Sequence, residues 1–553
     1  MSIPAQQSES LVSELQSVLA KIIAETNGIA LRSTLDLLQQ SPVDAFSSDA
    51  HRAIDEFSKL LTAFQIRHVP IEQVLEHPFA EALFNYFHDF GLHFQEHHTH
   101  LTGALDESFV FPRLQEALAG PHGAQIAEQI REVYGIDAST LKTPEDISAL
   151  IRLRDDESDQ PFVQYLRKML LTKVVLTTKQ AHHDAAYHMA ERLWNEANVG
   201  FIRLKWSFSR ANSTGAAEEI PGMEHLSSED ITVALYEGFR DFQSKHPGFS
   251  FELAPSFRKE LDYFDTSRFQ DKQEDINNQV NEILAIIDRH PELAAVMTSV
   301  DTVGNEMHFY SKENYMAFKA AFRKLQFRGF KIRSHHGETW YTLRRGIQSV
   351  DNALNIWSID AVEHGVALGI NPNYYFHRLF QEALEYNVQQ KPIAEGTSLW
   401  RELSDMDWRS DGHVLTKLLQ GDLLSDEDRT AFIKTKFHTS REVERYQHDI
   451  LNRMIDTGVE LVSLPSSNYK LTTQFGDYKE HPFSWWEKKG MELSIGTDNY
   501  VLLNSNIIRE MLILLFTDPE GLKLTKLLMV ATGEHRRPYM SSVLWDMRRD
   551  KGI

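Results

Sequence analysis

The stretch His98-Thr99-His100-Leu101-Thr102-Gly103-Ala104-Leu105 follows an extended-looking run from Leu92 to His97, and the rest of the chain is organised around it. Side chains two residues apart on a strand leave from the same face, so His98 and His100 can converge on one point. Two neutral imidazoles are good ligands for zinc or a similar divalent cation. The chain holds 25 histidines, so this pair is weak evidence until residues downstream support it.

Composition limits the classes of protein to consider. The 553 residues, 42% of them hydrophobic, suffice for several domains or for one large barrel with additions. A formal net charge of -22 argues against a nucleic-acid polymer or an anionic membrane as the main partner. The chain has no cysteine, so a metal site must use histidines and carboxylates. Without a targeting pattern or a membrane-spanning apolar run, a cytoplasmic protein with no membrane partner is expected.

After Leu92, short β-rich runs alternate with helical patterns. The eight runs lie near residues 92–100, 199–207, 249–254, 294–302, 329–335, 358–365, 458–465 and 491–498. Between them, Thr143-Pro144 and Ser227-Ser228 have the form of helix starts, with acids in the first turn. Strands that alternate with helices indicate parallel crossovers, and eight of them favour an α/β fold with a closed (β/α)8 TIM-type barrel.

The segments outside this alternation predict the domain organisation. Residues 1–90 show helical periodicity without strands, which predicts an N-terminal helical region packed on the main domain or on a neighbouring subunit. We expect the barrel over 91–520 and a C-terminal helical tail over 521–553. Residues from about 370 to 456 are too many for one crossover and carry helical patterns. They predict an inserted helical subdomain that covers the site or mediates assembly, with a homo-oligomer as one possibility.

A barrel of this kind carries its functional residues at the carboxyl ends of its strands. Six of the eight predicted strand ends carry ionisable or glycine-flanked groups. They hold His98 and His100, Asp301 to Glu306, Ser334 to Glu338, Glu363 to Gly365, Leu464 to Asn468, and Gly496 to Asn499. This clustering supports a common site better than any single motif does.

The ordered motifs resemble those of the adenosine and AMP deaminase family of the amidohydrolase superfamily. The matching elements are His-x-His-Leu-x-Gly-Ala at His98, His-x-Gly-Glu at His335, His-Gly at His364, Pro-x-Ser-Asn at Pro465 and Thr-Asp at Thr497. The phrase from Val199 to Ser207 is similar to the family's second strand, and His481-Pro482 followed by Gly490 resembles its approach to the last strand. The resemblance extends from about Leu92 to Ser505.

The resemblance implies a metal site and a catalytic pair. One divalent metal, most simply zinc, would be held by His98, His100, His335 and Asp498, with a position left for water. Glu338 would donate a proton to the ring nitrogen beside the attacked carbon. His364 would orient the water and stabilise the developing charge, and Asp498 would also take its proton.

The resemblance also implies the substrate. An adenine nucleoside or nucleotide, such as adenosine, deoxyadenosine or AMP, would be converted to its hypoxanthine form with release of ammonia. The backbone N–H of Gly304 would contact the purine. Asn499 stands where the family usually has a second aspartate that contacts the imidazole edge of the base, so it either donates through its amide or marks a changed substrate. Thr102 stands where the family commonly has an acidic or amide residue near the sugar.

Several residues allow two interpretations. Asp301, Glu306 and Glu363 would either support the metal ligands or be plain acids of the barrel rim. Four basic residues also have two interpretations: they would bind a substrate phosphate, or most of them would form surface ion pairs. They are Lys205, Arg333, Arg344 and Arg345. Three functional alternatives also remain, namely deamination of another amine-bearing heterocycle, a non-catalytic scaffold on a decayed barrel, and a deaminase that works within a larger assembly.

Overall fold

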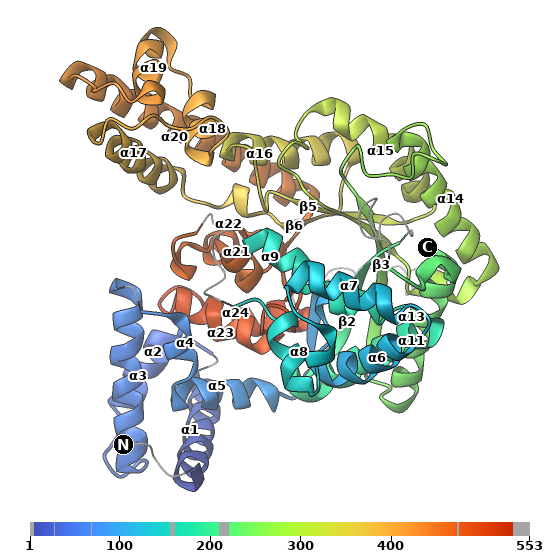
Figure 1. The fold of residues 1–553 in the computed structure, drawn as a ribbon. Coiled ribbons are helices and arrows are strands. Elements are labelled where there is room, and N and C mark those ends of the chain that lie inside the picture. Colours follow the sequence, from blue (N-terminus) through green and yellow to red (C-terminus); the bar gives the residue numbers. More distant parts are fainter. Residues whose placement is uncertain are drawn as a thin grey trace, which may run out of the picture.

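The computed structural model describes residues 5–26, 28–67, 69–154, 161–208, 220–472 and 475–534. It confirms the (β/α)8 barrel, because eight parallel strands pair in chain order from the first to the eighth. The strands are β1 (Phe94–His100), β2 (Val199–Ser207), β3 (Ser250–Arg258), β4 (Ser299–Val303), β5 (Lys331–His336), β6 (Ala361–His364), β7 (Glu460–Ser463) and β8 (Leu493–Ile495). Figure 1 shows the sheet enclosed by the surrounding helices.

The barrel closes where β8 returns to β1. The Asp498 N–H donates to the His98 carbonyl at 2.8 Å, and the His100 N–H donates to the Asp498 carbonyl at 2.8 Å. These two bonds form a parallel bridge between Thr99 and Asp498. The closing contact therefore joins the His-x-His motif to the aspartate that follows the last strand.

Two predicted strands differ from the structure by four residues or more at one end. The third strand runs on to Arg258, four residues beyond its predicted end. The fourth begins at Ser299 rather than 294, because Pro291 opens a short 3-10 helix, η4 (Pro291–Ala295). Proline favours a first helical position, where its missing N–H costs nothing. Both shifts leave the strand ends at the same rim.

The connection from β1 to β2 is long, and its described part contains helices and loops but no strand. Its helices are η1 (Leu101–Gly103), α6 (Glu107–Ala119), α7 (Gly123–Tyr134), η2 (Ala138–Thr140), α8 (Pro144–Ile151), α9 (Pro161–Lys168), α10 (Leu170–Val174) and α11 (Lys179–Ala197). The predicted start at Thr143 is confirmed as a capping box with Asp146. Helices α9 and α10 lie over the carboxyl ends of the strands, where they supply part of the cavity wall.

Shorter connections complete the barrel. They contain η3 (Met223–His225), α13 (Ser228–Lys245), α14 (Lys272–Arg289), α15 (Lys312–Phe327), α16 (Leu343–Asn352), η5 (Ala353–Trp357), α21 (Pro465–Thr472), η8 (Tyr478–Glu480) and α22 (Phe483–Lys489), whereas η6 (Val366–Leu368) opens the longer connection from β6 to β7. The helix predicted from Ser227 to about Lys245 is confirmed as α13, with a capping box at Ser227.

The N-terminal region is helical and packs against helix α23 (Ile507–Thr517) near the other end of the chain. It contains α1 (Ala5–Thr26), α2 (Leu31–Gln39), α3 (Ser48–Ile66), α4 (Ile71–Leu75) and α5 (Pro78–His88). The chain ends its described part with α23 (Ile507–Thr517) and α24 (Leu524–Thr532). Phe57 of α3 packs edge-on against Phe516 of α23, and Gln65 donates to the Phe516 carbonyl at 2.6 Å. Of the expected C-terminal tail, residues 535–553 lie outside the described residues.

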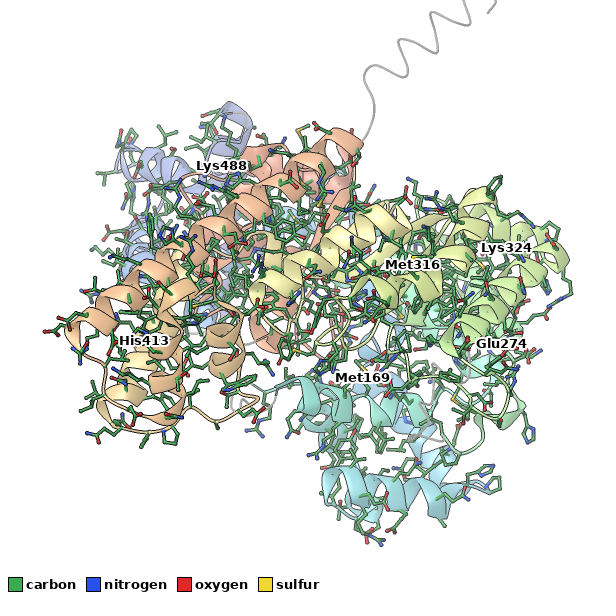
Figure 2. All side chains as sticks on the ribbon, turned by 90° about the horizontal axis from the view of Figure 1, so that it is seen from above. Met169, Glu274, Met316, Lys324, His413 and Lys488 are labelled. Atoms are coloured by element: carbon green, nitrogen blue, oxygen red, sulfur yellow. The ribbon has the colours of Figure 1, made fainter. Side chains whose placement is uncertain are left out.

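The residues between β6 and β7 form four helices that project from the barrel (Figure 1). They are α17 (Pro372–Val388), α18 (Ser398–Asp405), α19 (Gly412–Gln420) and α20 (Asp426–Thr457), with the 3-10 turn η7 (Arg409–Asp411). In the view of Figure 2, Met169 lies between His413 of α19 on one side and Glu274 of α14 on the other. Among the described helices, none combines the length and the apolar character needed to cross a membrane.

Candidate metal centre and active site

Four side chains converge at the junction of β1 and β8. The His98 Nε2 lies 3.1 Å from the His100 Nε2, which lies 3.3 Å from the His335 Nε2. The Asp498 Oδ1 lies 3.6 Å from the His98 Nε2 and 3.5 Å from the His100 Nε2. Three ring nitrogens and one carboxylate oxygen therefore surround one small volume, and they are the four ligands predicted from the sequence.

The protonation of the histidines fits a bound cation. The His98 Nδ1 lies 2.7 Å from Glu363 and the His335 Nδ1 lies 3.1 Å from Asp301, so each Nδ1–H donates to a carboxylate and each Nε2 keeps its lone pair. Burial and the nearby Lys205 ammonium hold the pKa of both rings well below the usual value. Lone pairs that face each other at such short distances repel unless a cation lies between them, so the donor set fits a metal.

Two buried cations lie beneath these ligands. The Lys205 Nζ is 2.9 Å from Glu363 and 3.3 Å from Asp301, and all three side chains are fully buried. Arg333 donates to Glu363 at 2.7 Å and to Glu460 at 3.0 Å. Burial alone would raise the pKa of Glu363, but Lys205 and Arg333 hold it well below its usual range. Asp301 and Glu363 therefore contact both the candidate ligands and a buried cation, and they do not lie on an exposed rim.

These contacts correct the interpretation of the basic residues. Lys205 and Arg333 do not form surface ion pairs; both are buried below the candidate ligands, where they pair with Asp301 and Glu363. Strands of a parallel barrel are buried on both faces, so a charged residue within such a strand has to find a buried partner. Arg344 and Arg345 lie elsewhere, in ion pairs with Glu442 and Asp405.

Asp498 is held in a strained conformation. Its backbone has a φ of 64°, in the left-handed region that costs a non-glycine residue about 1–3 kcal/mol. The Ser467 hydroxyl donates to Asp498 Oδ2 at 2.6 Å, which leaves Oδ1 directed at the histidines. In the protein without a cation, burial raises the pKa of Asp498 to about 7. The carboxyl must lose this proton before it can bind a metal.

A chain of hydrogen bonds sets the tautomer of His364. The His481 Nε2 lies 3.3 Å from Asn468 Oδ1, and the Asn468 amide nitrogen lies 2.9 Å from the His364 Nδ1. Because the Asn468 NH2 group can only donate, the His364 Nδ1 accepts and its Nε2 carries the hydrogen. That Nε2 is buried without a hydrogen-bond partner in the described part of the chain, and it lies 3.7 Å from Glu338. His364 also has a left-handed φ of 70°.

Glu338 is a buried carboxyl poised to be protonated. Burial raises its pKa well above the usual value, and the charges of Asp498 and Glu306 add to this shift. Glu306 holds the loop that carries Glu338, since it accepts hydrogen bonds from the backbone N–H groups of Gly337, Glu338 and Thr339 at 2.6–3.1 Å. Glu306 thus also supports the site. His336, next to His335 on the strand, packs among aromatic rings.

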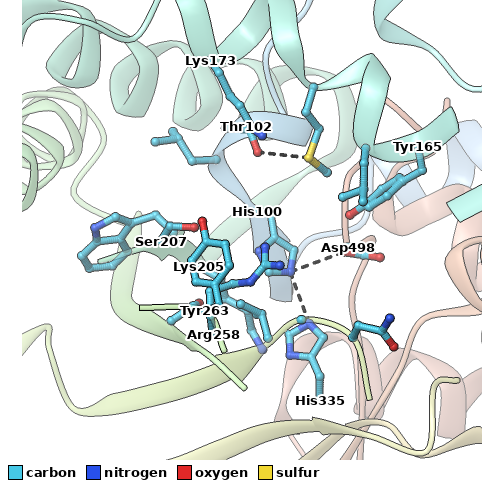
Figure 3. A pocket seen from close by; sticks show the side chains of 18 of the residues that line it. His100, Thr102, Tyr165, Lys173, Lys205, Ser207, Arg258, Tyr263, His335 and Asp498 are labelled. Carbon is cyan, nitrogen blue, oxygen red and sulfur yellow. Dashed lines mark hydrogen bonds and ion pairs between the residues drawn. The ribbon is translucent and has the colours of Figure 1, made fainter. Parts of the chain in front are cut away.

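A cavity of about 730 Å³ opens over these groups. Its floor contains His100, His335, Glu338, His364 and Asp498. Figure 3 shows His100, His335 and Asp498 directed toward one another, with Tyr165 and Thr102 on the wall above them. The volume is in the range of small-molecule sites.

The predicted substrate residues fall into two groups. Gly304 and Thr102 line the cavity. Gly304 has a φ of 107°, and a Cβ there would lie 2.2 Å from the Glu260 carboxylate. Thr102 donates to the Met169 sulfur at 3.6 Å. Asn499 instead lies fully buried beneath the cavity wall.

Sequence reasoning missed several residues of the site. Asn468 and His481 lie in matched motifs, but their spacing alone does not show that they orient His364. Tyr165, Met169 and Lys173 line the cavity from α9 and α10, in a segment where no motif marks them. The amphipathic pattern of α9 was the one available indication, and it is equally typical of core packing.

No protein-family model and no curated protein sequence matches the chain. Among solved structures, it is similar to an amidohydrolase from Burkholderia ambifaria with bound Zn, at 15% identity and TM-score 0.46 over 84% of this chain and 93% of that one. An adenine deaminase from Arthrobacter aurescens is similar at 13% identity and TM-score 0.43, over 78% of this chain and 92% of that one. The N6-methyl-AMP deaminase of Arabidopsis thaliana is similar at 14% identity and TM-score 0.43, over 80% of this chain and 90% of that one. At these levels, the chemistry has to be inferred from the side chains.

Proposed function

We propose that the protein is a zinc-dependent hydrolytic deaminase that converts an adenine nucleoside or nucleotide to its hypoxanthine form and releases ammonia. The observation that carries this proposal is the convergence of His98, His100, His335 and Asp498 on the floor of the cavity. Three neutral imidazoles with one carboxylate suit zinc. When bound there, the ion would supply Lewis acidity and lower the pKa of water for attack on the base.

Glu338 and His364 would each hold a hydrogen beside the attacked carbon. The raised pKa of Glu338 keeps its carboxyl protonated, so it can donate to the ring nitrogen as the ring takes up negative charge. The His364 Nε2–H, held by Asn468, donates a hydrogen bond to the oxygen that adds to the ring. The two protons of the added water restore the Glu338 carboxyl and, by way of Asp498, protonate the departing amine, which leaves as ammonia. No serine or cysteine nucleophile is needed for this reaction.

The cavity supports a small-molecule substrate with a flat heterocycle. Glu338, Gly304 and Thr102 all line it, so the base and its substituent would lie between the floor and helices α9 and α10. Lys173 and Arg258 also line this cavity and could meet a phosphate. The choice between nucleoside and nucleotide is left to the assay.

The test is ammonia release by purified protein of measured metal content. The panel contains adenosine, deoxyadenosine, AMP, ATP and non-purine amines, and Glu338→Gln is the variant. One metal per chain and turnover of an adenine compound that falls about 10²- to 10⁴-fold in the variant would support the proposal. Turnover of a non-purine amine alone would favour the alternative heterocycle, and absence of both metal and activity would refute an enzyme.

A further inference from the structure

The loop that carries Glu338 is held by the helical insertion. This loop runs from Gly337 to Thr342, between β5 and α16, and Glu306 of the barrel binds the backbone at its start. Helix α18 of the insertion binds the rest of the loop, and the residues that contact each other are 59 to 63 positions apart in the chain. Figure 1 shows α18 beside α16, the helix into which the loop leads.

Two side chains of α18 bind consecutive residues of this loop. The Arg401 Nε donates to the Tyr341 carbonyl at 3.1 Å, and the Arg401 guanidinium also lies 5.2 Å from the centre of the Tyr341 ring. The Thr342 hydroxyl donates to Asp405 Oδ2 at 2.8 Å. Because Thr342 is also the N-cap of α16, its position sets where the loop ends and the helix begins.

Glu402 is the central contact of α18. Its side chain is buried, and its Oε1 accepts from the N–H of Leu343, the first residue of α16, at 2.7 Å and from the Tyr375 hydroxyl at 2.7 Å. The hydroxyl of Tyr375, on α17, in turn accepts from the Trp340 Nε1–H at 3.4 Å. Trp340 lies two residues after Glu338. One carboxylate oxygen therefore connects the insertion both to the start of α16 and to the loop.

The contacts on the two sides of Glu338 restrict its position. Glu306 fixes the backbone of residues 337–339, and α18 with Tyr375 fixes residues 340–343. A general acid acts only when its proton lies within hydrogen-bond reach of the reacting atom. A displacement of about 1 Å that starts far from the chemistry can lower the rate about 100-fold.

We propose that α18 positions Glu338 for proton transfer and that Glu402 is the central positioning residue. The inference rests on the proposed deaminase function, because that function gives Glu338 its role. In the part of the chain that the structure describes, no residue of the insertion lines the cavity. The influence of the insertion on the reaction therefore passes through the loop.

The experiment compares kcat and KM of metal-loaded native protein, Glu402→Ala and Glu402→Gln on the adenine compound that native protein turns over best. Alanine removes the acceptor of Leu343 and Tyr375, so kcat should fall about 10- to 100-fold, with KM within about threefold because the cavity wall is unchanged. Glutamine keeps the Oε1 acceptor, and burial already raises the pKa of Glu402 to about 7, so a neutral side chain is tolerated there. Glu402→Gln should restore kcat to within about threefold of native protein.

Asn387→Ala is the matched control. Asn387 is a buried side chain of α17 that accepts from the Leu424 N–H at 3.2 Å and donates to the Asp422 carbonyl at 2.7 Å. Its loss leaves a backbone N–H without this acceptor, as Glu402→Ala does, but inside the insertion. Both alanine variants should have a lower Tm, whereas only Glu402→Ala should have a lower kcat.

A second variant tests the proposal if Glu402→Ala does not fold. Arg401 is half-buried, so Arg401→Met removes the bond to the Tyr341 carbonyl without emptying a core position. The loss of one hydrogen bond that positions the loop should lower kcat about 3- to 10-fold at unchanged metal content. An unchanged kcat in Arg401→Met, with Glu402→Ala unfolded, would contradict the proposal.

Hydrogen exchange gives a measurement that needs no substrate. The amides of residues 339–343 should exchange at least about tenfold faster in Glu402→Ala than in native protein, and at the native rate in Asn387→Ala. Native exchange rates in Glu402→Ala would overturn the proposal, and so would faster exchange with an unchanged kcat or an equal loss of kcat in Asn387→Ala. If native protein turns over no adenine compound, the proposed function fails, and the exchange rates still decide whether α18 holds the loop.

Discussion

Replacing Glu363 with glutamine should weaken metal binding without touching a ligand. The Glu363 carboxylate accepts from the His98 Nδ1 at 2.7 Å, and it also lies 2.9 Å from Lys205 and 2.7 Å from Arg333. Glutamine keeps the shape and one acceptor oxygen but loses the charge. The His98 ring then loses its charged partner, and the positive charges of Lys205 and Arg333 act more strongly on an incoming cation.

The size of this effect follows from the role of the carboxylate. Loss of a carboxylate that orients a metal-binding histidine lowers metal affinity about 10- to 100-fold, which is about 1.4–2.7 kcal/mol. Glu363 serves His98 directly and neutralises both cations beneath the site. We therefore expect a loss toward the upper end of this range.

Competition of the protein with a zinc-binding dye measures the change. Glu460→Gln is the matched control, because Glu460 is also buried and accepts from Arg333 at 3.0 Å, but it lies beside His97 rather than beside a proposed ligand. The control should bind zinc within about threefold of native protein. An affinity of Glu363→Gln within the same limit would refute the reasoning.

Four further predictions concern single groups of the site. The apparent zinc Kd should rise about tenfold for each pH unit below 7, because burial raises the pKa of Asp498 to about 7 and its proton must leave on binding; a pH-independent Kd between 5 and 7 would contradict this. Because the pKa of Asp498 is raised in the fold, the protonated carboxyl stabilises the metal-free fold at acid pH. This stabilisation is lost as the pH rises through about 7, and measurements of Tm over a series of pH values can follow the loss. Asn468→Asp should place a hydrogen on the His364 Nδ1 and remove it from Nε2, which lowers kcat about 10²-fold at unchanged metal content; an unchanged kcat would show that the tautomer does not matter. Gly103→Ala should displace Asn499, since the new Cβ would lie 1.7 Å from its oxygen, and reduce both Tm and zinc affinity; retention of both would show that the loop yields freely.

The fold and the converging residues could be predicted because both follow from order along the chain. Each strand end of a parallel barrel lies at the same rim, so His98, His335 and Asp498 meet there whatever the details of the helices. The position of a residue at a strand end can be predicted without knowledge of the side chains around it. The strand bounds shifted by several residues in places, but the rim stayed the same.

The sequence left two interpretations for Asp301, Glu306 and Glu363, because the contacts that distinguish a support of the site from a rim acid depend on register between strands. Lys205 comes from β2, Asp301 from β4 and Glu363 from β6, and nothing in their spacing shows that they share one buried cluster. Tyr165 is harder still, because it comes from a helix in a long connection whose path over the barrel is set by tertiary packing. Asn499 was predicted as a substrate contact, yet its donors go to Asp498 and Tyr165.

The junction of β1 and β8 bears on how the protein is made. Glu96 accepts from the Thr497 N–H at 3.0 Å across 401 residues of chain, and the ligands predicted beside it lie on both sides of the same junction. During synthesis, the ribosome must deliver the eighth strand before a complete ligand set exists, so metal loading follows closure of the barrel. The bound ion would then hold the first strand to the last. Removal of the metal by a chelator should increase the rate of hydrogen exchange at the amides of His100 and Asp498 more than at other amides of the barrel.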